Sequence, residues 1–252
     1  MSDRLEGRAE IDAELQGSVA RGLGAVRDRV EQAARAAGRD PASVALLAVS
    51  KLQPAAKLRA AYSLGQRDFG ENYAQELVAK AAELADLPDL RFHMIGHLQR
   101  NKVASLVGLV SAVHSVDSVR LAAELGKRAK DRPVPLARRL APNGELMVFI
   151  EVNVAGEAQK SGCSPAELAD VIAAVRAEPA LRLAGLMAIP AGGGEASVSR
   201  AQFEMLRELQ EEHGGPGLLP GSSIGMSRDL EVAIECGSTW VRVGTDVFGA
   251  RG

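Results

Sequence analysis

The 252-residue sequence has few aromatic residues, only two cysteines and no long apolar run. Phe, Trp and Tyr make up 3% of the chain, which argues against a protein that binds nucleic acid by stacking bases on aromatic side chains. Cys163 and Cys236 lie far apart and show no CxxC or Cys/His spacing, so neither a disulfide framework nor a zinc site is indicated. The formal net charge of −2 gives no basic surface for nucleic acid or for an acidic membrane.

The N-terminus also lacks the apolar core of a secretory signal, and no segment has the length of a bilayer span. We therefore expect a cytoplasmic protein with no nucleic acid and no membrane as a partner. Hydrophobic residues make up 46% of the chain, enough for a sizeable core. We expect one domain over residues 1–252, in a monomeric protein.

Short β-rich runs alternate with longer segments that carry a helical stripe of apolar residues. The runs predicted as strands are residues 44–50, 67–70, 91–95, 110–116, 146–154, 181–189, 222–225 and 240–244. The segments between them are predicted as helices, and a further helix, about residues 18–37, precedes the first strand. This α/β alternation favours a parallel sheet closed into a single (β/α)8 TIM barrel, with an open doubly wound sheet as the alternative.

Three segments are expected outside these elements. Residues 1–17 form an N-terminal extension, and residues 191–197 form a glycine-rich loop. Residues 127–144 hold three prolines and six basic residues, which fits either a basic binding patch or a solvated loop. We predict the solvated loop.

Several predicted strands end in polar residues, and in such barrels the chemistry lies where strands end and loops begin. Lys51 follows the first strand, either because the strand reaches the surface there or because its amine is a nucleophile at the barrel mouth. Strands seven and eight lead into Gly225-Met226-Ser227 and Gly244-Thr245, whose glycines and hydroxyls favour a phosphate site. Ser227 also fits a helix N-cap, as do Asp117 and Ser164.

Arg242 lies on the opposite side of the last strand from Val241 and Val243. If that side is the barrel interior, the guanidinium needs an anionic or acceptor partner, and a salt bridge to a carboxylate is the simplest one. A strand-end lysine opposite a phosphate site suggests pyridoxal 5′-phosphate, whose aldehyde forms a Schiff base with lysine and whose phosphate needs an anchor.

Seven stretches that together span nearly the whole chain resemble the pyridoxal phosphate homeostasis proteins, also called the YggS or PROSC family. They are LLAVSKLQP (46–54), FGENYAQEL (69–77), FHMIGHLQRNKV (92–103), HSVDS (114–118), EVNVAGEAQKSGC (151–163), GLMAIPA (185–191) and SIGMSRDLEVAIECGSTWVRVGTDVFGAR (223–251). The resemblance implies a barrel similar to the N-terminal domain of alanine racemase (fold type III), with the cofactor on Lys51. It also implies that Ser227, Gly244 and Thr245 hold the phosphate, that Arg242 faces the pyridine nitrogen, and that Asn72 lies near the ring.

Three functions remain open at this point. The first is a carrier that binds and buffers pyridoxal phosphate, a form of vitamin B6, and hands it to apo-enzymes that depend on it. The second is an amino-acid racemase of the alanine racemase type or a decarboxylase, and the third is a metabolite enzyme on an unrelated barrel whose Lys51 forms a Schiff base with its substrate.

We predict the carrier, with little or no catalytic turnover. An arginine cannot accept a proton, so it leaves the pyridine nitrogen unprotonated and makes the ring a poorer electron sink. Racemisation also needs a second base, commonly a tyrosine, and only Tyr62 and Tyr73 are present. We further expect no second domain to close the barrel mouth, because the chain ends a few residues after the last predicted strand.

Overall fold

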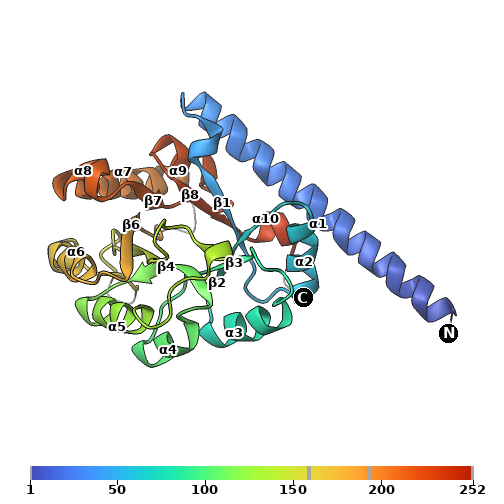
Figure 1. Cartoon of the computed structure of the whole chain (residues 1–252). Coiled ribbons are helices and arrows are strands. Elements are labelled where there is room, and N and C mark those ends of the chain that lie inside the picture. Colours follow the sequence, from blue (N-terminus) through green and yellow to red (C-terminus); the bar gives the residue numbers. More distant parts are fainter. Residues whose placement is uncertain (1, 158–159, 192–194, 251–252) are drawn as a thin grey trace.

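Eight parallel strands close into a barrel in the order of the sequence, with β8 hydrogen-bonded to β1 (Figure 1). The computed structural model describes residues 2–157, 160–191 and 195–250, with side chains from residue 13 onward. The strands are β1 (Ala45–Val49), β2 (Asp68–Glu71), β3 (Arg91–Met94), β4 (Val110–Val116), β5 (Leu146–Glu151), β6 (Leu181–Met187), β7 (Gly221–Ser223) and β8 (Trp240–Val243). The predicted TIM barrel is confirmed, and the open doubly wound sheet is wrong.

All eight predicted strands are present, but β5, β6 and β7 end two or three residues earlier than predicted. After β5 the chain leaves the ladder, and Val152 forms only an isolated bridge with Cys163. After β6 the chain reaches Pro190, which has no N–H with which to continue a ladder. Apolar runs therefore located both strands, while the backbone hydrogen bonds set their ends.

Helices follow the strands along the chain and cover the outside of the barrel (Figure 1). They are α2 (Ala55–Ser63), α3 (Ala74–Glu83), α4 (Val103–Leu106), α5 (Val119–Ala129), α6 (Leu168–Arg176), α7 (Ala196–Glu212), α8 (Gly215–Leu218), α9 (Leu230–Glu235) and α10 (Thr245–Phe248). In the ranges that the structure describes, no helix combines the length and the apolar character needed to cross a bilayer.

The first helix, α1 (Ser2–Ala36), is longer than the predicted helix of about residues 18–37. Residues 2–17, predicted as an extension, continue this helix. Its second half buries Val19, Leu23 and Val26, spaced as one face of a helix. Gly22 approaches α10 so closely that a Cβ atom there would lie 2.5 Å from the Val247 carbonyl oxygen. The α1 helix thus packs against α2, α9 and α10 along one side of the barrel (Figure 1).

One of the three predicted N-caps is confirmed. Ser164 forms a capping box with Glu167 at the 3-10 turn η4 (Pro165–Glu167). The prediction for Asp117 is wrong, because Ser118, in extended backbone directly before α5, accepts from Leu121 N at 3.4 Å. The prediction for Ser227 is also wrong, because the N-cap position of α9 belongs to Asp229.

The basic segment 127–144 begins inside α5 and contains one 3-10 turn, η3 (Leu136–Arg138). Its side chains from 131 to 137 are exposed apart from Val134. Arg132, Arg138 and Arg139 donate hydrogen bonds to backbone carbonyls at Ala104, Pro88 and Val134 respectively. The segment is largely exposed to solvent, and two of its arginines, Arg132 and Arg138, fasten it to its surroundings.

Candidate functional site

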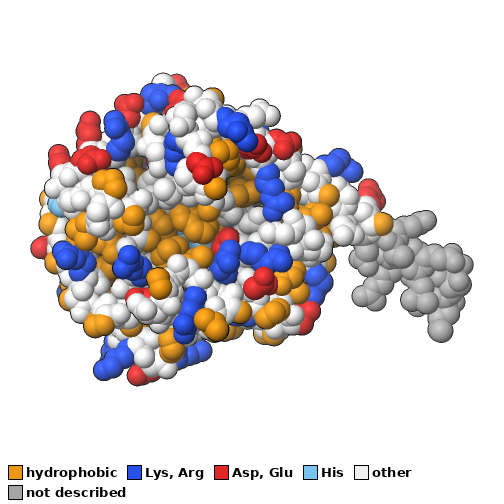
Figure 2. Space-filling view, turned by 45° about the horizontal axis from the view of Figure 1, so that its top comes forward, with side chains coloured by type: hydrophobic (Ala, Val, Ile, Leu, Met, Phe, Trp, Pro, Cys, Tyr) orange, Lys and Arg blue, Asp and Glu red, His pale blue; other side chains and the backbone are white. Residues whose placement is uncertain are grey.

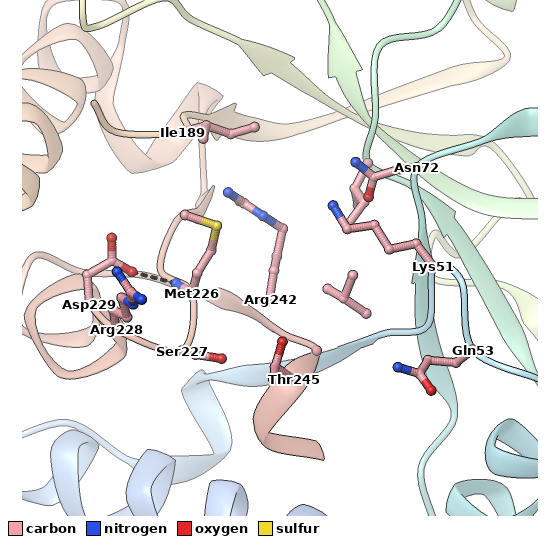
Figure 3. Close-up of a pocket in the computed structure, with 13 residues that line it drawn as sticks. Lys51, Gln53, Asn72, Ile189, Met226, Ser227, Arg228, Asp229, Arg242 and Thr245 are labelled. Carbon is pink, nitrogen blue, oxygen red and sulfur yellow. Dashed lines mark hydrogen bonds between the residues drawn. The ribbon is translucent and has the colours of Figure 1, made fainter. Parts of the chain in front are cut away.

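The ends of several strands surround one cavity of about 270 Å³ at the mouth of the barrel (Figure 3). It is lined by Val49, Lys51, Gln53, Asn72, Ile95, Ile189, Met226, Ser227, Arg228, Asp229, Arg242, Gly244 and Thr245. All six residues predicted to bind the cofactor are in this set. Barrel closure brings them together from the ends of β1, β2, β7 and β8. Figure 2 shows hydrophobic side chains gathered over the middle of one face of the barrel, with charged side chains mostly around them.

Lys51 lies in a tight turn directly after β1. The next residue, Leu52, has a φ angle of 59°, which is uncommon for a residue with a side chain and needs support from its surroundings. That support comes from α3, where the Glu76 carboxylate accepts a hydrogen bond from Leu52 N at 2.6 Å. The turn is therefore fixed on the side that follows Lys51.

A buried charge network fixes the other side of the same turn. Lys80 on α3 donates to the Ser50 carbonyl oxygen at 2.6 Å, and to Glu71 Oε1 and Glu76 Oε1 at 2.7 Å each. The Ser50 hydroxyl also donates to Glu71 Oε1, at 2.6 Å. Burial raises the pKa of Glu71, and the hydrogen bond from Lys80 opposes that rise. Sequence reasoning missed this network, although Glu76 and Lys80 show the i,i+4 spacing of a helical ion pair.

Asn72 lies beside Lys51 in the cavity (Figure 3). Its backbone touches the next strand end so closely that a Cβ atom on Gly96 would lie 2.4 Å from the Asn72 carbonyl oxygen. The side-chain oxygen Oδ1 is buried, and no described atom donates a hydrogen bond to it. A buried acceptor without a donor is unfavourable, so Asn72 is ready to accept a hydrogen bond from a ligand.

Arg242 faces the barrel interior, as its alternation with two valines suggested, and it is 4% exposed. The salt bridge considered for it is wrong: no described carboxylate lies within ion-pair distance. Its guanidinium donates instead to the Ser223 carbonyl oxygen, to Ser223 Oγ at 2.9 Å and to the Ala188 carbonyl oxygen at 3.0 Å. Burial lowers the pKa of Arg242 to about 10, so the group is still a cation at neutral pH.

Ser227 lies on the β7–α9 loop, across the cavity from Lys51 (Figure 3). The Asp229 carboxylate shapes this loop by accepting hydrogen bonds from Met226 N at 2.6 Å and Ser199 Oγ at 2.9 Å. Gly225 enters the loop with a φ angle of 95°, and a Cβ atom there would lie 2.5 Å from the Ala233 Cβ. The loop therefore requires glycine at this position.

Arg29 of α1 joins this loop to the start of α10, which follows Gly244 and begins at Thr245. Its Nη2 donates to the Ser227 carbonyl oxygen at 2.9 Å, its Nε to Glu231 Oε1 at 2.8 Å, and its Nη1 to Asp246 Oδ2 at 2.8 Å. Reasoning from strand ends could not find Arg29, because α1 precedes the barrel and nothing in its sequence marks one arginine among several.

Glu151, the last residue of β5, is a second buried carboxyl that sequence reasoning missed. Burial raises its pKa to about 7, the positive charge of Arg242 opposes that rise, and Asp117 adds to it. Its position at the end of a strand could have marked Glu151 as a candidate site residue. The sequence of the apolar run around it does not show whether its carboxyl is ionised.

Comparison with known proteins places this arrangement in a family. Residues 22–252 match the family described as alanine racemase, N-terminal domain. The pyridoxal phosphate homeostasis protein of Pseudomonas aeruginosa is 48% identical over 93% of this chain and 96% of its own length. The protein of that name from Escherichia coli K12 is 41% identical over 92% of this chain and 97% of its own. This chain belongs to the pyridoxal phosphate homeostasis protein family.

Solved structures agree with that family assignment. The PLP-bound structure of PipY from Synechococcus elongatus matches with a TM-score of 0.74 and 36% identity, covering 92% of this chain and all of that chain. Alanine racemase from Streptomyces lavendulae matches with a TM-score of 0.68 at 18% identity, over 93% of this chain and 57% of that chain. The second likeness shows the fold alone, and the family resemblance in the sequence is confirmed.

Proposed function

We propose that this protein binds pyridoxal 5′-phosphate in the barrel-mouth cavity and serves in vitamin B6 homeostasis, buffering or delivering the cofactor with little or no turnover. The observation that carries the proposal is the convergence of three chemical groups on one cavity. Lys51 supplies an amine, Arg242 a buried cation with no described carboxylate in contact, and Ser227 and Thr245 two hydroxyls after the neighbouring strands β7 and β8. These match the aldehyde, the ring nitrogen and the phosphate of the cofactor.

The cavity residues fit the cofactor in detail. When bound, pyridoxal phosphate supplies an electrophilic aldehyde with which the Lys51 amine forms a covalent link. Arg242 would donate a hydrogen bond to the pyridine nitrogen, and the unsatisfied Asn72 Oδ1 would accept one beside the ring. Ser227, Gly244 and Thr245 would hold the phosphate, on the β7–α9 loop and at the start of α10, two segments that Arg29 ties together. Both protein relatives reported above carry the name pyridoxal phosphate homeostasis protein, which supports the same assignment.

The racemase alternative has only a distant fold relation in its favour. Tyr62 packs on the outside of the barrel, where its ring lies 4.0 Å from the Arg67 guanidinium carbon and its hydroxyl contacts Asp89. Tyr73 is 54% exposed and is not among the described residues that line the cavity. We also propose that the protein is a monomer and that it hands the cofactor to apo-enzymes.

The test is a titration of the purified protein with pyridoxal phosphate, followed by borohydride reduction and peptide mapping. We expect a yellow complex and a pyridoxyl group on Lys51. The Lys51→Ala variant should lose the absorbance while keeping its fold, and Lys102→Ala, on the neighbouring 3-10 turn η2 (Arg100–Lys102), should keep both. A pyridoxyl group on another lysine, or no binding at all, would refute the assignment.

A further inference from the structure

Five polar side chains form one continuous hydrogen-bonded chain through the interior of the barrel. They are Arg242, Ser223, His114, His93 and Asp68. Arg242 Nη1 lies 2.9 Å from Ser223 Oγ, which lies 2.8 Å from His114 Nδ1. His114 Nε2 lies 3.0 Å from His93 Nδ1, and His93 Nε2 lies 3.0 Å from Asp68 Oδ1. The chain thus connects the cavity to Asp68, the first residue of β2, near the opposite end of the barrel.

Aromatic rings enclose the middle of this chain. Phe149 stacks on His114 with ring centroids 4.5 Å apart, and Trp240 lies 5.0 Å from His93 and 6.0 Å from His114. His93, His114 and Ser223 have no exposed surface. In such an environment each polar atom depends on its partner within the chain, so the positions of the hydrogens are determined by the geometry.

With both imidazoles neutral, only one direction of hydrogen bonding satisfies every member. A guanidinium has donors only, so Ser223 Oγ accepts from Arg242 and gives its own hydrogen to His114 Nδ1. His114 then carries its proton on Nε2 and donates it to His93 Nδ1. His93 in turn carries its proton on Nε2 and donates to the Asp68 carboxylate. If both rings carried the proton on Nδ1 instead, the unprotonated His93 Nε2 would face the Asp68 carboxylate, and two acceptors would meet without a hydrogen between them.

The far end of the chain is a fixed carboxylate. Arg91 donates to Asp68 through Nε and Nη2, at 2.6 Å each. Burial raises the pKa of Asp68, but hydrogen bonds from Arg91 and His93 outweigh burial and lower the pKa to about 2. Burial also lowers the pKa of His114 far below its ordinary value. Asp68 is thus ionised and His114 neutral at neutral pH, as the single direction requires.

We propose that Ser223, His114, His93 and Asp68 are positioning residues that hold Arg242 as a directed hydrogen-bond donor to the ring nitrogen of the bound ligand. This inference rests on the proposed function of the cavity. The three acceptors that hold the guanidinium, one hydroxyl and two carbonyls, are all uncharged, so its positive charge stays available at the cavity. The carboxylate that ends the chain is itself occupied by Arg91, at a distance from the ligand.

The first test uses the protein without cofactor. The chain has four histidines, so long-range proton–nitrogen NMR spectra of the imidazoles can be assigned with the His97→Gln and His213→Gln variants. We expect the proton of each ring to lie on Nε2 and not on Nδ1, and His114 to stay neutral across neutral pH. A proton on Nδ1 of either ring would overturn the proposed direction.

The second test compares two serines on the same strand. Ser223→Ala removes the hydroxyl of the chain, whereas Ser222→Ala removes one that donates to the Gly237 carbonyl oxygen instead. Ser223→Ala should move the His114 nitrogen signals, shift the absorption band of the bound cofactor and raise the Kd for pyridoxal phosphate about tenfold. Ser222→Ala should change none of the three, and thermal unfolding reports whether each variant is folded.

The outcomes separate the two hypotheses. An unchanged absorption band and Kd in folded Ser223→Ala would refute the positioning role while leaving the proposed function intact. A proton on Nδ1 of His93 or His114 in a wild-type protein that binds the cofactor would likewise refute the positioning role and leave the proposed function intact. Failure of the wild-type protein to bind pyridoxal phosphate would refute the proposed function, and with it the role of the chain.

Discussion

Lys80 is a single buried cation that serves two carboxylates and a carbonyl oxygen. We expect Lys80→Met to lower the free energy of unfolding by about 3–5 kcal/mol, because Glu71 would be left buried without its partner. The loss should be smaller in acid, where Glu71 becomes neutral, and Glu71→Gln in the Lys80→Met background should recover part of it. Urea unfolding at two pH values measures both effects.

Arg128→Met is the control for that change. Arg128 forms an i,i+4 pair with Glu124 on the exposed face of α5, and solvent screens such pairs, so we expect no measurable loss. A loss for Lys80→Met no larger than that of the control would mean that the buried network does not stabilise the Lys51 turn.

Thr245 tests the phosphate end of the cavity. If its hydroxyl donates to the phosphate, Thr245→Val should weaken pyridoxal phosphate binding by about 1–3 kcal/mol, because a charge-assisted hydrogen bond is lost. Binding of pyridoxal, which has no phosphate, should be weak and unaffected by the substitution. Fluorescence titration with both compounds measures the difference.

Thr239→Val is the matched control, since Thr239 accepts a hydrogen bond from Ser222 N just before β8 and does not line the cavity. Thr239→Val should lower the stability of the protein and leave the Kd values for pyridoxal phosphate and pyridoxal unchanged. Equal affinity of the wild-type protein for pyridoxal and pyridoxal phosphate would place the phosphate elsewhere.

The α1 helix acts on the cavity through one side chain. Arg29→Met should loosen the β7–α9 loop, which carries Ser227, and the start of α10, which carries Thr245, since both lose the same partner. We expect a roughly three- to tenfold rise in the Kd for pyridoxal phosphate and a smaller rise for pyridoxal. Arg35→Met changes an arginine of the same helix whose ion pair is with Glu31, and it should leave both constants unchanged. Equal effects of the two substitutions would show that Arg29 does not position these two segments.

The elements themselves were largely predictable, because apolar runs and βα alternation depend on local sequence. Even β7, three residues long, was located, although its predicted range of 222–225 lies slightly later than the observed Gly221–Ser223. What local sequence could not supply were contacts between distant positions. Ser223 meets His114 across 109 residues, and Arg29 meets Ser227 across 198, only because the barrel closes and α1 folds back on its last helices. Lys51 and Arg242, by contrast, were found because Lys51 closely follows a strand that the sequence marks clearly and Arg242 lies within another.

The stability of the whole molecule should depend on pH through Glu151. Its folded pKa of about 7 lies above its ordinary value of 4.5, so the native state holds a proton that the unfolded chain releases. Stability from this group is present below pH 4.5 and is lost as pH rises through about 7, by on the order of 3 kcal/mol. Glu151→Gln should flatten that slope in urea unfolding, and Glu204→Gln, exposed on α7, should leave it unchanged. A slope that persists in Glu151→Gln would assign the titration to another group.

The barrel as a whole should bind its cofactor without completing a catalytic cycle. Racemisation requires a base on each face of the substrate, and Lys51 is the one amine among the described residues that line the cavity. Asp229 also lines it, but hydrogen bonds from Met226 N and Ser199 already hold its carboxylate. Tyr73, at the start of α3, is the remaining candidate for a second base, and its side chain is largely exposed.

We therefore expect racemisation and decarboxylation of a panel of L-amino acids by cofactor-loaded protein to stay far below about 1 s⁻¹, the low end of typical enzyme turnover. Chiral chromatography of the amino acids measures the rate, and Lys51→Ala supplies the background. The Tyr73→Phe variant gives the test its second arm, because a real second base would make any observed rate depend on that hydroxyl. Turnover at about 1 s⁻¹ or faster that disappears in Tyr73→Phe would identify Tyr73 as that base and make the protein an enzyme.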